Sequence, residues 1–176
     1  MTENLFEKVI NLVLEDKMVG LFQGDSEWGP RALGNRSLLF NPLADKLDYF
    51  NRIKDREWWR PLAGVVMLEH ANEYFDMVGV KESPLMSFAF KVKVDNLPCI
   101  TTPIKTCRIQ TVTEEQNPIL YRLCCVMKEK TGVPIIGNTS FNLAGEVIVE
   151  TREQALDVVR RSDIDSVFFP ETGELL

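Results

Sequence analysis

Two arginines, Arg31 and Arg36, lie in a glycine-rich segment at residues 24–37 (GDSEWGPRALGNRS). Glycines allow backbone N–H groups to come close to a ligand, and a guanidinium group donates paired hydrogen bonds to phosphate or carboxylate oxygens. This composition predicts a loop that binds an anion. The segment matches neither the GxxxxGK[ST] pattern of P-loops nor the GxGxxG pattern of dinucleotide-binding folds, so it belongs to neither type of site.

Two further polar clusters follow, each at the end of a predicted strand or helix. Lys54 and Arg56 alternate in NRIKDREWWRP, and in an extended chain both cationic ends can point to one place. Asn138, Ser140 and Asn142 alternate in GNTSFN and can direct their hydrogen-bonding groups at one ligand. Cationic side chains near loops rich in N–H donors are what a phosphate or nucleotide site requires.

Each cluster also has a purely structural interpretation. Arg31 can be a loop arginine paired with Glu27, and the Lys54 and Arg56 pair can be a solvated surface. The NTSFN segment can be a turn whose side chains bond their own backbone. The three clusters together favour the ligand-binding interpretation, because they gather cationic and polar groups in a chain that is acidic overall.

The composition restricts the class of protein and its partners. The chain has 176 residues, 45% hydrophobic and 26% charged, which is typical of one globular domain. Its net charge of -6 argues against general binding to nucleic acid or to an anionic membrane. No apolar run is long enough to span a bilayer and the first residues lack the pattern of a secretion signal, so we expect a cytoplasmic protein.

No metal site is expected from the side chains. The four cysteines form no CxxC pair, and the one histidine, His70, lies beside Glu69 in a position typical of a capping or surface group. Magnesium can still arrive with the phosphates of a substrate. Catalysis by a Ser/His or Cys/His pair has little support, because there is no GxSxG motif and no evident nucleophile beside the histidine.

Alternating helices and strands must position these clusters. Several adjacent strands have no helix between them, so we expect an α/β fold with a mixed sheet in a single domain. Hydrophobic spacing predicts helices over residues 3–17, 42–55, 71–77, 117–132 and 151–163, and strands over 18–23, 37–42, 63–68, 85–94, 106–112, 133–138, 147–150 and 166–170.

Four motifs occur in the same order as in a known family: EWGPRALGNRS, NRIKDREWWRP, CRIQTV and TGVPIIGNTSFNLAGEVIVET. Read together, they resemble the carboxyl-terminal domain of the NodU/CmcH-type O-carbamoyltransferases. The resemblance covers about residues 18–170, and it implies a YrdC-like fold, a twisted mixed sheet flanked by helices. It also implies that ATP and carbamoyl phosphate react in this domain to give carbamoyladenylate and pyrophosphate.

In that family a separate amino-terminal Kae1-like domain, which carries a metal and the acceptor pocket, transfers the carbamoyl group to a hydroxyl. The resemblance marks the nucleotide site with a Lys-x-Arg pair and a Ser-x-Asn pair. It therefore implies two groups of site residues. The catalytic group is Lys54, Arg56, Ser140 and Asn142, and the group that binds substrate or nucleotide is Arg31, Arg36, Arg108, Asn138 and Thr139.

Two departures from the family keep alternatives open. Many relatives carry an Asp-Gly pair and a histidine before the segment that matches CRIQTV, whereas this chain has TTPIKT, so we expect a contact near Arg108 to be lost or replaced by Lys105. The Kae1-like domain is not found in the 176 residues. A regulatory nucleotide-binding module that kept the fold, and a YrdC-like threonylcarbamoyladenylate synthase, are the alternatives. Trp58 and Trp59 can either pack internally or contact a partner domain.

Overall fold

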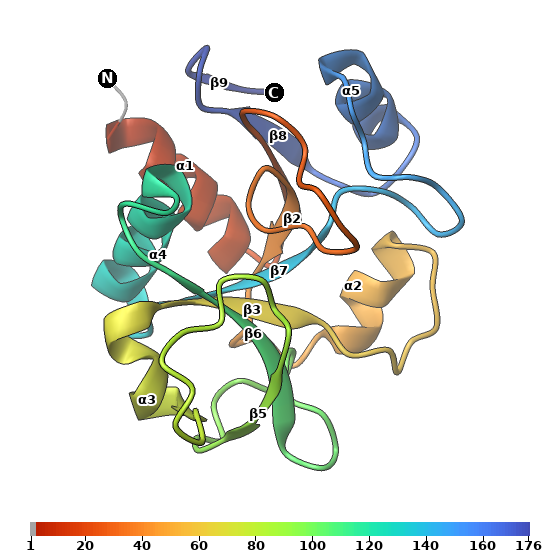
Figure 1. Cartoon of the computed structure of the whole chain (residues 1–176). Coiled ribbons are helices and arrows are strands. Elements are labelled where there is room, and N and C mark those ends of the chain that lie inside the picture. Colours follow the sequence, from red (N-terminus) through yellow and green to blue (C-terminus); the bar gives the residue numbers. More distant parts are fainter. Residues whose placement is uncertain (1–2) are drawn as a thin grey trace.

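The computed structural model describes residues 3–176, which form a nine-stranded sheet with helices on both faces (Figure 1). The strand order is β4-β5-β6-β3-β7-β2-β1-β8-β9. The helices are α1 (Glu3–Leu14), α2 (Leu47–Ile53), α3 (Ala71–Tyr74), α4 (Pro118–Thr131) and α5 (Arg152–Arg160), with a 3-10 helix at Leu68–His70. The strands are β1 (Val19–Phe22), β2 (Arg36–Phe40), β3 (Ala63–Met67), β4 (Phe75–Asp76), β5 (Ala89–Val92), β6 (Thr106–Val112), β7 (Ile135–Ser140), β8 (Ser166–Phe169) and β9 (Glu174–Leu175).

The sheet is mixed, as the sequence predicts. β1 pairs with β8 and β3 pairs with β6 in parallel, while β2 and β7 run antiparallel to their neighbours. The central strand β7 lies between β3 and β2, so the carboxyl end of β7 meets the loops that precede β2 and β3. This arrangement brings the three polar clusters of the sequence to the same region of the molecule.

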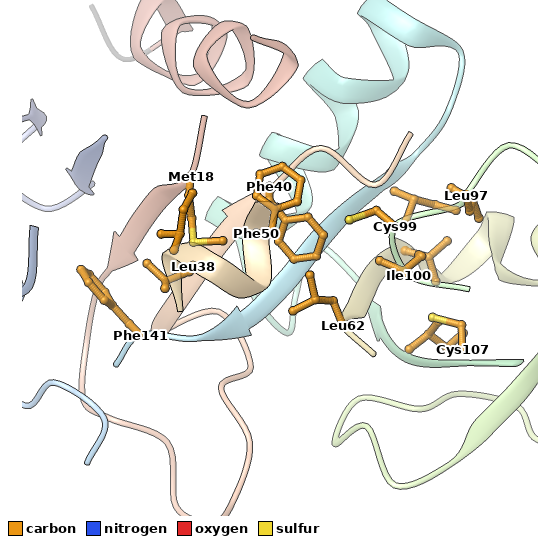
Figure 2. Close-up of a cluster of buried hydrophobic side chains, with 14 of the residues drawn as sticks. Met18, Leu38, Phe40, Phe50, Leu62, Leu97, Cys99, Ile100, Cys107 and Phe141 are labelled. Carbon is orange, nitrogen blue, oxygen red and sulfur yellow. The ribbon is translucent and has the colours of Figure 1, made fainter. Parts of the chain in front are cut away.

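Each face of the sheet has its own hydrophobic core. Alternation along β2 sends Leu38 and Phe40 to one face and Leu39 to the other. Helices α1 and α4, which lie side by side in Figure 1, cover the face of Leu39, while α2 and α5 cover the opposite face. On that face the ring of Phe40 lies against the ring of Phe50 of α2, with 5.0 Å between their centroids (Figure 2). This contact fixes α2 beside the central strands.

Gly137 of β7 allows this packing. A Cβ atom at this position would lie 2.2 to 2.4 Å from atoms of the Phe40 ring, closer than any real contact. The absence of a side chain therefore lets the ring of Phe40 pass directly over β7. The strand continues from this point to Asn138 and Ser140, so the core packing of Phe40 and the position of the polar end of β7 are coupled.

Local signals in the sequence set the ends of the two best-predicted helices. The Asn117 side chain accepts a hydrogen bond from the Leu120 N–H at the start of α4, and Gly132 ends that helix in the left-handed conformation. Thr151 begins α5 with a capping box completed by Gln154. Both helices are confirmed within two or three residues of their predicted bounds.

Several predicted elements differ from the structure. The predicted helix 71–77 ends at Tyr74, because Phe75–Asp76 pair with β5 as strand β4, and the predicted strand 85–94 is reduced to Ala89–Val92. The predicted helix 42–55 is shorter, because residues 41–46 form turns and α2 begins at Leu47. The predicted strand at 147–150 is wrong: Val149 donates its N–H to the Phe141 carbonyl and Glu150 donates to the Gln154 side chain, so no ladder forms. Strand β9 has only two residues and no pattern in the sequence indicated it. No helix within residues 3–176 is long and apolar enough to cross a membrane.

Candidate active site

A cavity of about 820 Å³ opens where the carboxyl end of β7 meets four loop segments. The segments come from the glycine-rich loop before β2, the loop after α2, the residues around the start of β5, and the stretch that leads into β6. The polar and charged residues that line the cavity are Arg31, Arg56, Glu57, Arg60, Thr102, Thr106, Arg108, Asn138, Thr139 and Ser140.

Four arginines give the cavity a strong positive charge. They are Arg31, Arg56, Arg60 and Arg108, and the one carboxylate among the lining residues is Glu57, whose Oε2 lies 3.6 Å from Nη1 of Arg60. Such a concentration of positive charge in a chain with a net charge of -6 is local rather than general. The cavity is therefore suited to an anion with several charged oxygens, such as a polyphosphate.

Arg56 is the arginine held most firmly at the cavity. Its Nε donates a 2.6 Å hydrogen bond to Oδ1 of Asn51, while its Nη2 is buried with no hydrogen-bond partner among residues 3–176. Burial and the nearby charge of Arg60 lower the pKa of Arg56 to about 10, so the group stays cationic at neutral pH. A buried nitrogen without an acceptor is unusual in a folded protein, and here it belongs to a residue of the cavity wall.

Lys54 and Arg56 do not point to the same place. Lys54 continues the helical backbone after α2 (φ -79°, ψ 0°), and Asp55 adopts a left-handed conformation with φ 49°. The extended chain on which the sequence prediction depends is therefore absent between them, and Lys54 turns away from the cavity toward the turn that follows β7.

Lys54 and Asn142 form a partly buried network of hydrogen bonds with Ser140. Lys54 Nζ donates to the carbonyl oxygens of Ser140 and Asn142 and, at 2.9 Å, to Oδ1 of Asn142. Ser140 Oγ donates to the same Oδ1 at 2.6 Å. Of these three residues Ser140 lines the cavity. Lys54 as a whole is 3% exposed. Its ammonium group therefore fixes, from a buried position, the turn that presents Ser140.

The surroundings of Lys54 change its protonation. Burial is the largest cause and the charges of Arg56 and Arg60 add to it, so the pKa of Lys54 falls to about 7, with Glu146 acting in the opposite direction. Near neutral pH the lysine therefore exchanges between its charged and neutral forms. Few lysines do this in proteins, and those that do are commonly found at functional sites.

Asn138 connects the sheet to the glycine-rich loop. Its Nδ2 donates to the carbonyl of Ala32 at 3.1 Å and to Oε1 of Gln110 at 3.2 Å, and Gln110 in turn donates to the carbonyl of Leu33 at 2.7 Å. Its Oδ1 is buried without a partner in the described part of the chain. Thr139, the next residue of β7, also lines the cavity.

Arg36 does not reach the cavity. It is 3% exposed, its guanidinium group donates to the carbonyls of Gln23 and Gly24 at 2.7 and 3.0 Å, and it lies over the ring of Phe22 at 3.7 Å. Sequence reasoning could not separate it from Arg31, because both occur in the same loop motif. The sequence predicts that Arg36 binds substrate or nucleotide. In the structure its guanidinium group instead bonds the backbone of its own loop and does not line the cavity.

Glu27 anchors the loop that carries Arg31. Its Oε1 accepts hydrogen bonds from the backbone N–H groups of Leu33, Asn35 and Arg36 at 2.7, 2.6 and 3.3 Å. The carboxylate thus organises the loop backbone rather than forming the ion pair with Arg31 that the structural interpretation suggested. Because one charged oxygen accepts three backbone N–H groups, it restrains the backbone of residues 33–36 strongly.

We expect Glu27→Ala to loosen the glycine-rich loop and to lower the free energy of unfolding by about 2 kcal/mol, because three partly buried N–H groups lose their acceptor. Trypsin should then cleave after Arg31 much faster than in the wild-type protein. The exposed Glu114 provides a matched control, since Glu114→Ala should change neither quantity. Unchanged cleavage in Glu27→Ala would show that other contacts hold the loop.

Several residues of the site have no clear signal in the sequence. Arg60 and Trp59 follow Arg56 in the same motif, but their types alone do not distinguish a cavity wall from a surface. Asn51 and Gln110 are buried polar residues that bond to site residues, and nothing in a single sequence identifies such partners. Within residues 3–176 no group of three or more His, Cys, Asp or Glu side chains could hold a metal ion.

Comparisons with known proteins identify similar sequences. The family model described as carbamoyltransferase C-terminus matches residues 10–172. The nodulation protein NolO of Bradyrhizobium diazoefficiens is 38% identical over 156 residues, which are 85% of this chain and 28% of that protein. The 3'-hydroxymethylcephem-O-carbamoyltransferase of Amycolatopsis lactamdurans is 38% identical over 132 residues, 74% of this chain and 25% of that enzyme.

A solved structure shares the fold. The crystal structure of full-length HypF in its phosphate- and nucleotide-bound form matches with a TM-score of 0.64 and 23% identity, over 92% of this chain and 26% of that one. The chain spans about a quarter to a third of the length of the curated relatives that it matches.

Proposed function

This chain belongs to the carbamoyltransferase C-terminal family, and from that premise we propose that its cavity binds ATP and carbamoyl phosphate and forms carbamoyladenylate. The observation that carries the proposal is the cluster of Arg31, Arg56, Arg60 and Arg108 around the polar end of β7. Carbamoyl phosphate and ATP are both polyanions, so an enzyme that joins them must first offset their mutual repulsion.

The proposed reaction has two steps that balance. In the first step, water hydrolyses carbamoyl phosphate to carbamate, inorganic phosphate and a proton. An oxygen of carbamate then forms a bond to the α-phosphorus of ATP while the bond from that phosphorus to the bridging oxygen of pyrophosphate breaks. Each carbamoyladenylate is accompanied by one phosphate and one pyrophosphate, and both products can be measured.

The side chains suit a mechanism of positioning and charge neutralisation. We assign Arg56 and Arg60 to the phosphate oxygens, because they come from one loop and Arg56 has a buried nitrogen without a protein partner among the described residues. Arg31 and Arg108 approach from other segments of the wall, and Ser140 offers a hydroxyl at the end of β7. No protein nucleophile is required, because the attacking oxygen belongs to the substrate.

Lys54 and Asn142 contribute indirectly in this proposal, since they hold the turn that carries Ser140. Magnesium carried by the nucleotide would meet one cavity carboxylate, Glu57, so the phosphates and water would supply most of its ligands.

Transfer of the carbamoyl group to its acceptor is assigned to another part of the enzyme or to a partner, in line with the Kae1-like domain that the family resemblance implies. The short span of this chain relative to the proteins that it matches supports that division. Trp28 and Trp58 expose most of their side-chain surface beside the loops of the cavity, as residues of a protein interface do in the free protein.

The deciding experiment measures pyrophosphate release from ATP with and without carbamoyl phosphate. We expect release that depends on carbamoyl phosphate and that falls by about tenfold or more in Ser140→Ala, because the cavity loses a hydrogen-bonding hydroxyl. Ser162→Ala is the matched control: its hydroxyl bonds the Val158 carbonyl near the end of α5, and the variant should keep wild-type activity.

Other outcomes would redirect the assignment. ATP binding without turnover would favour a regulatory nucleotide-binding module. Turnover with threonine and bicarbonate in place of carbamoyl phosphate would favour a threonylcarbamoyladenylate synthase. Failure to bind either ATP or carbamoyl phosphate would refute the proposal.

A further inference from the structure

We propose that Asn51, a buried residue that does not line the cavity, is the positioning residue that holds Arg56 ready to bind an anion; the identity of that anion rests on the proposed function. Asn51 lies in the last turn of α2 and is 0% exposed. A fully buried asparagine near an arginine-rich cavity needs an explanation, because burial of an amide is costly unless every polar atom is bonded.

The side chain of Asn51 bonds to the loop after α2 through both its amide nitrogen, which donates, and its oxygen, which accepts. Its Nδ2 donates to the carbonyl oxygens of Trp58 and Arg60 at 2.8 and 2.9 Å, and its Oδ1 accepts from Nε of Arg56 at 2.6 Å. All three partners lie within nine residues of Asn51 in the chain. The amide therefore ties the whole loop 56–60 back to the end of α2.

This loop has little regular structure of its own. It follows the left-handed turn at Asp55 and contains no helix or strand. Its backbone contributes an N–H bond from Arg56 to the Asn51 carbonyl at 3.1 Å and one from Arg60 to the Glu57 carbonyl at 3.1 Å. The first bond fixes the start of the loop and the second closes a turn over residues 57–60, while the Asn51 side chain ties this turn and the guanidinium plane to α2.

The consequence for Arg56 is an oriented guanidinium group. The bond at Nε sets the direction of the plane, and it is the one hydrogen bond that the guanidinium group makes within residues 3–176, so the group is oriented while it lines the cavity. A side chain that is already ordered loses less conformational entropy when the ligand binds. Asn51 would thus raise affinity for the anion without touching it.

A positioning role and a merely structural role make different predictions. Either role lowers stability when the amide is lost, because the carbonyls of Trp58 and Arg60 lose their donors. Only a positioning role makes the loss of affinity depend on Arg56. A double-mutant cycle between Asn51 and Arg56 separates the two roles.

The experiment measures the affinity for ATP and for inorganic pyrophosphate by calorimetry, at a temperature below the unfolding transition of every variant. The proteins are the wild type, Asn51→Leu, Arg56→Ala and the double variant. We expect Asn51→Leu to weaken binding of both probes by about tenfold, the loss typical of one hydrogen bond to a charged group, and to have no further effect when Arg56 is alanine.

Asn41→Leu is the matched control. Asn41 is 8% exposed, and its amide donates to Asp16 at 2.9 Å and accepts from the Leu43 N–H at 3.0 Å, away from the cavity residues. It should lose stability but bind both probes within about twofold of the wild type. Wild-type affinity in Asn51→Leu, or an equal loss with Arg56 present and absent, would overturn the proposal.

A second measurement is made on the wild-type protein and needs one conservative variant for assignment. The Nε–H group of Arg56 should give a nitrogen-15 NMR signal that exchanges slowly with water in the ligand-free wild-type protein, assigned through its loss in Arg56→Lys. Arg52, whose side chain is 75% exposed, supplies the fast-exchanging reference. An Arg56 signal that exchanges as fast as that of Arg52 would overturn the proposal. If the wild type bound neither probe, the proposed function would fail, and this measurement would still decide the role of Asn51.

Discussion

Arg56→Ala should lower kcat/KM for pyrophosphate release that depends on carbamoyl phosphate by about 100-fold to 1,000-fold, the loss typical when one preorganised donor to a developing charge is removed. The expected size follows from the surroundings of Arg56. Asn51 fixes one of its nitrogens, another is buried without a partner within residues 3–176, and three further arginines line the same cavity. ATP affinity should fall in the same direction, and it can be measured without any transfer partner.

Arg52→Ala is a matched control for this prediction. Arg52 lies in α2, four residues before Arg56, and its side chain is 75% exposed with a long 3.8 Å contact to Asp48. Its loss should leave both quantities close to wild type. Arg56→Lys should recover only part of the activity, because an ammonium group lacks the planar fork that binds two oxygens. Activity above a third of wild type in Arg56→Ala would exclude Arg56 from phosphate binding.

Lys54→Met should remove a dependence of stability on pH that the wild-type protein shows between pH 6 and pH 9. The folded-state pKa of Lys54 is about 7, whereas the ordinary value is 10.5, so between these values the unfolded chain binds more protons than the folded one. Stability contributed by this group is therefore present at high pH and is lost as the pH falls through about 7. Over this range the free energy of unfolding should rise with pH by about 2–3 kcal/mol from this group.

Urea denaturation of both proteins at pH 6 and pH 9 checks the prediction. The wild type should gain stability relative to Lys54→Met as the pH rises, whatever the difference between them at a single pH. Lys46 is a suitable control, because its hydrogen bond to Asp16 raises its pKa and it stays charged in both states across this range. Lys46→Met should therefore follow the wild-type pH dependence. Parallel pH dependences for Lys54→Met and wild type would show that Lys54 stays charged when buried.

The two predictions concern residues 54–56, in which Lys54 and Arg56 have different roles. Arg56 lines the cavity, while Lys54 lies outside it and holds the turn of Ser140 and Asn142. The pair is therefore a junction between the loop after α2 and the end of β7.

The secondary structure could largely be predicted because its signals are local. Strand β6 has the bounds that alternation along TCRIQTV predicts, and α4 begins after Asn117 and ends before Gly132, as capping preferences require. The strand predicted at 147–150 failed because an apolar run predicts only a tendency to be extended. A strand also needs a neighbour with free N–H and carbonyl groups, and the N–H groups of Val149 and Glu150 found other acceptors.

The order of motifs along the chain was sufficient to predict the family and the fold class: an acidic α/β chain with three polar clusters, arranged as in a carbamoyltransferase C-terminal domain. It did not determine which members of each cluster face the ligand. Arg36 and Arg60 are both motif arginines, yet Arg36 bonds the carbonyls of its own loop whereas Arg60 lines the cavity. That choice depends on where buried acceptors lie after the chain has folded, and the acceptors come from residues that are distant in sequence or carry no pattern. Only the tertiary structure brings donor and acceptor together.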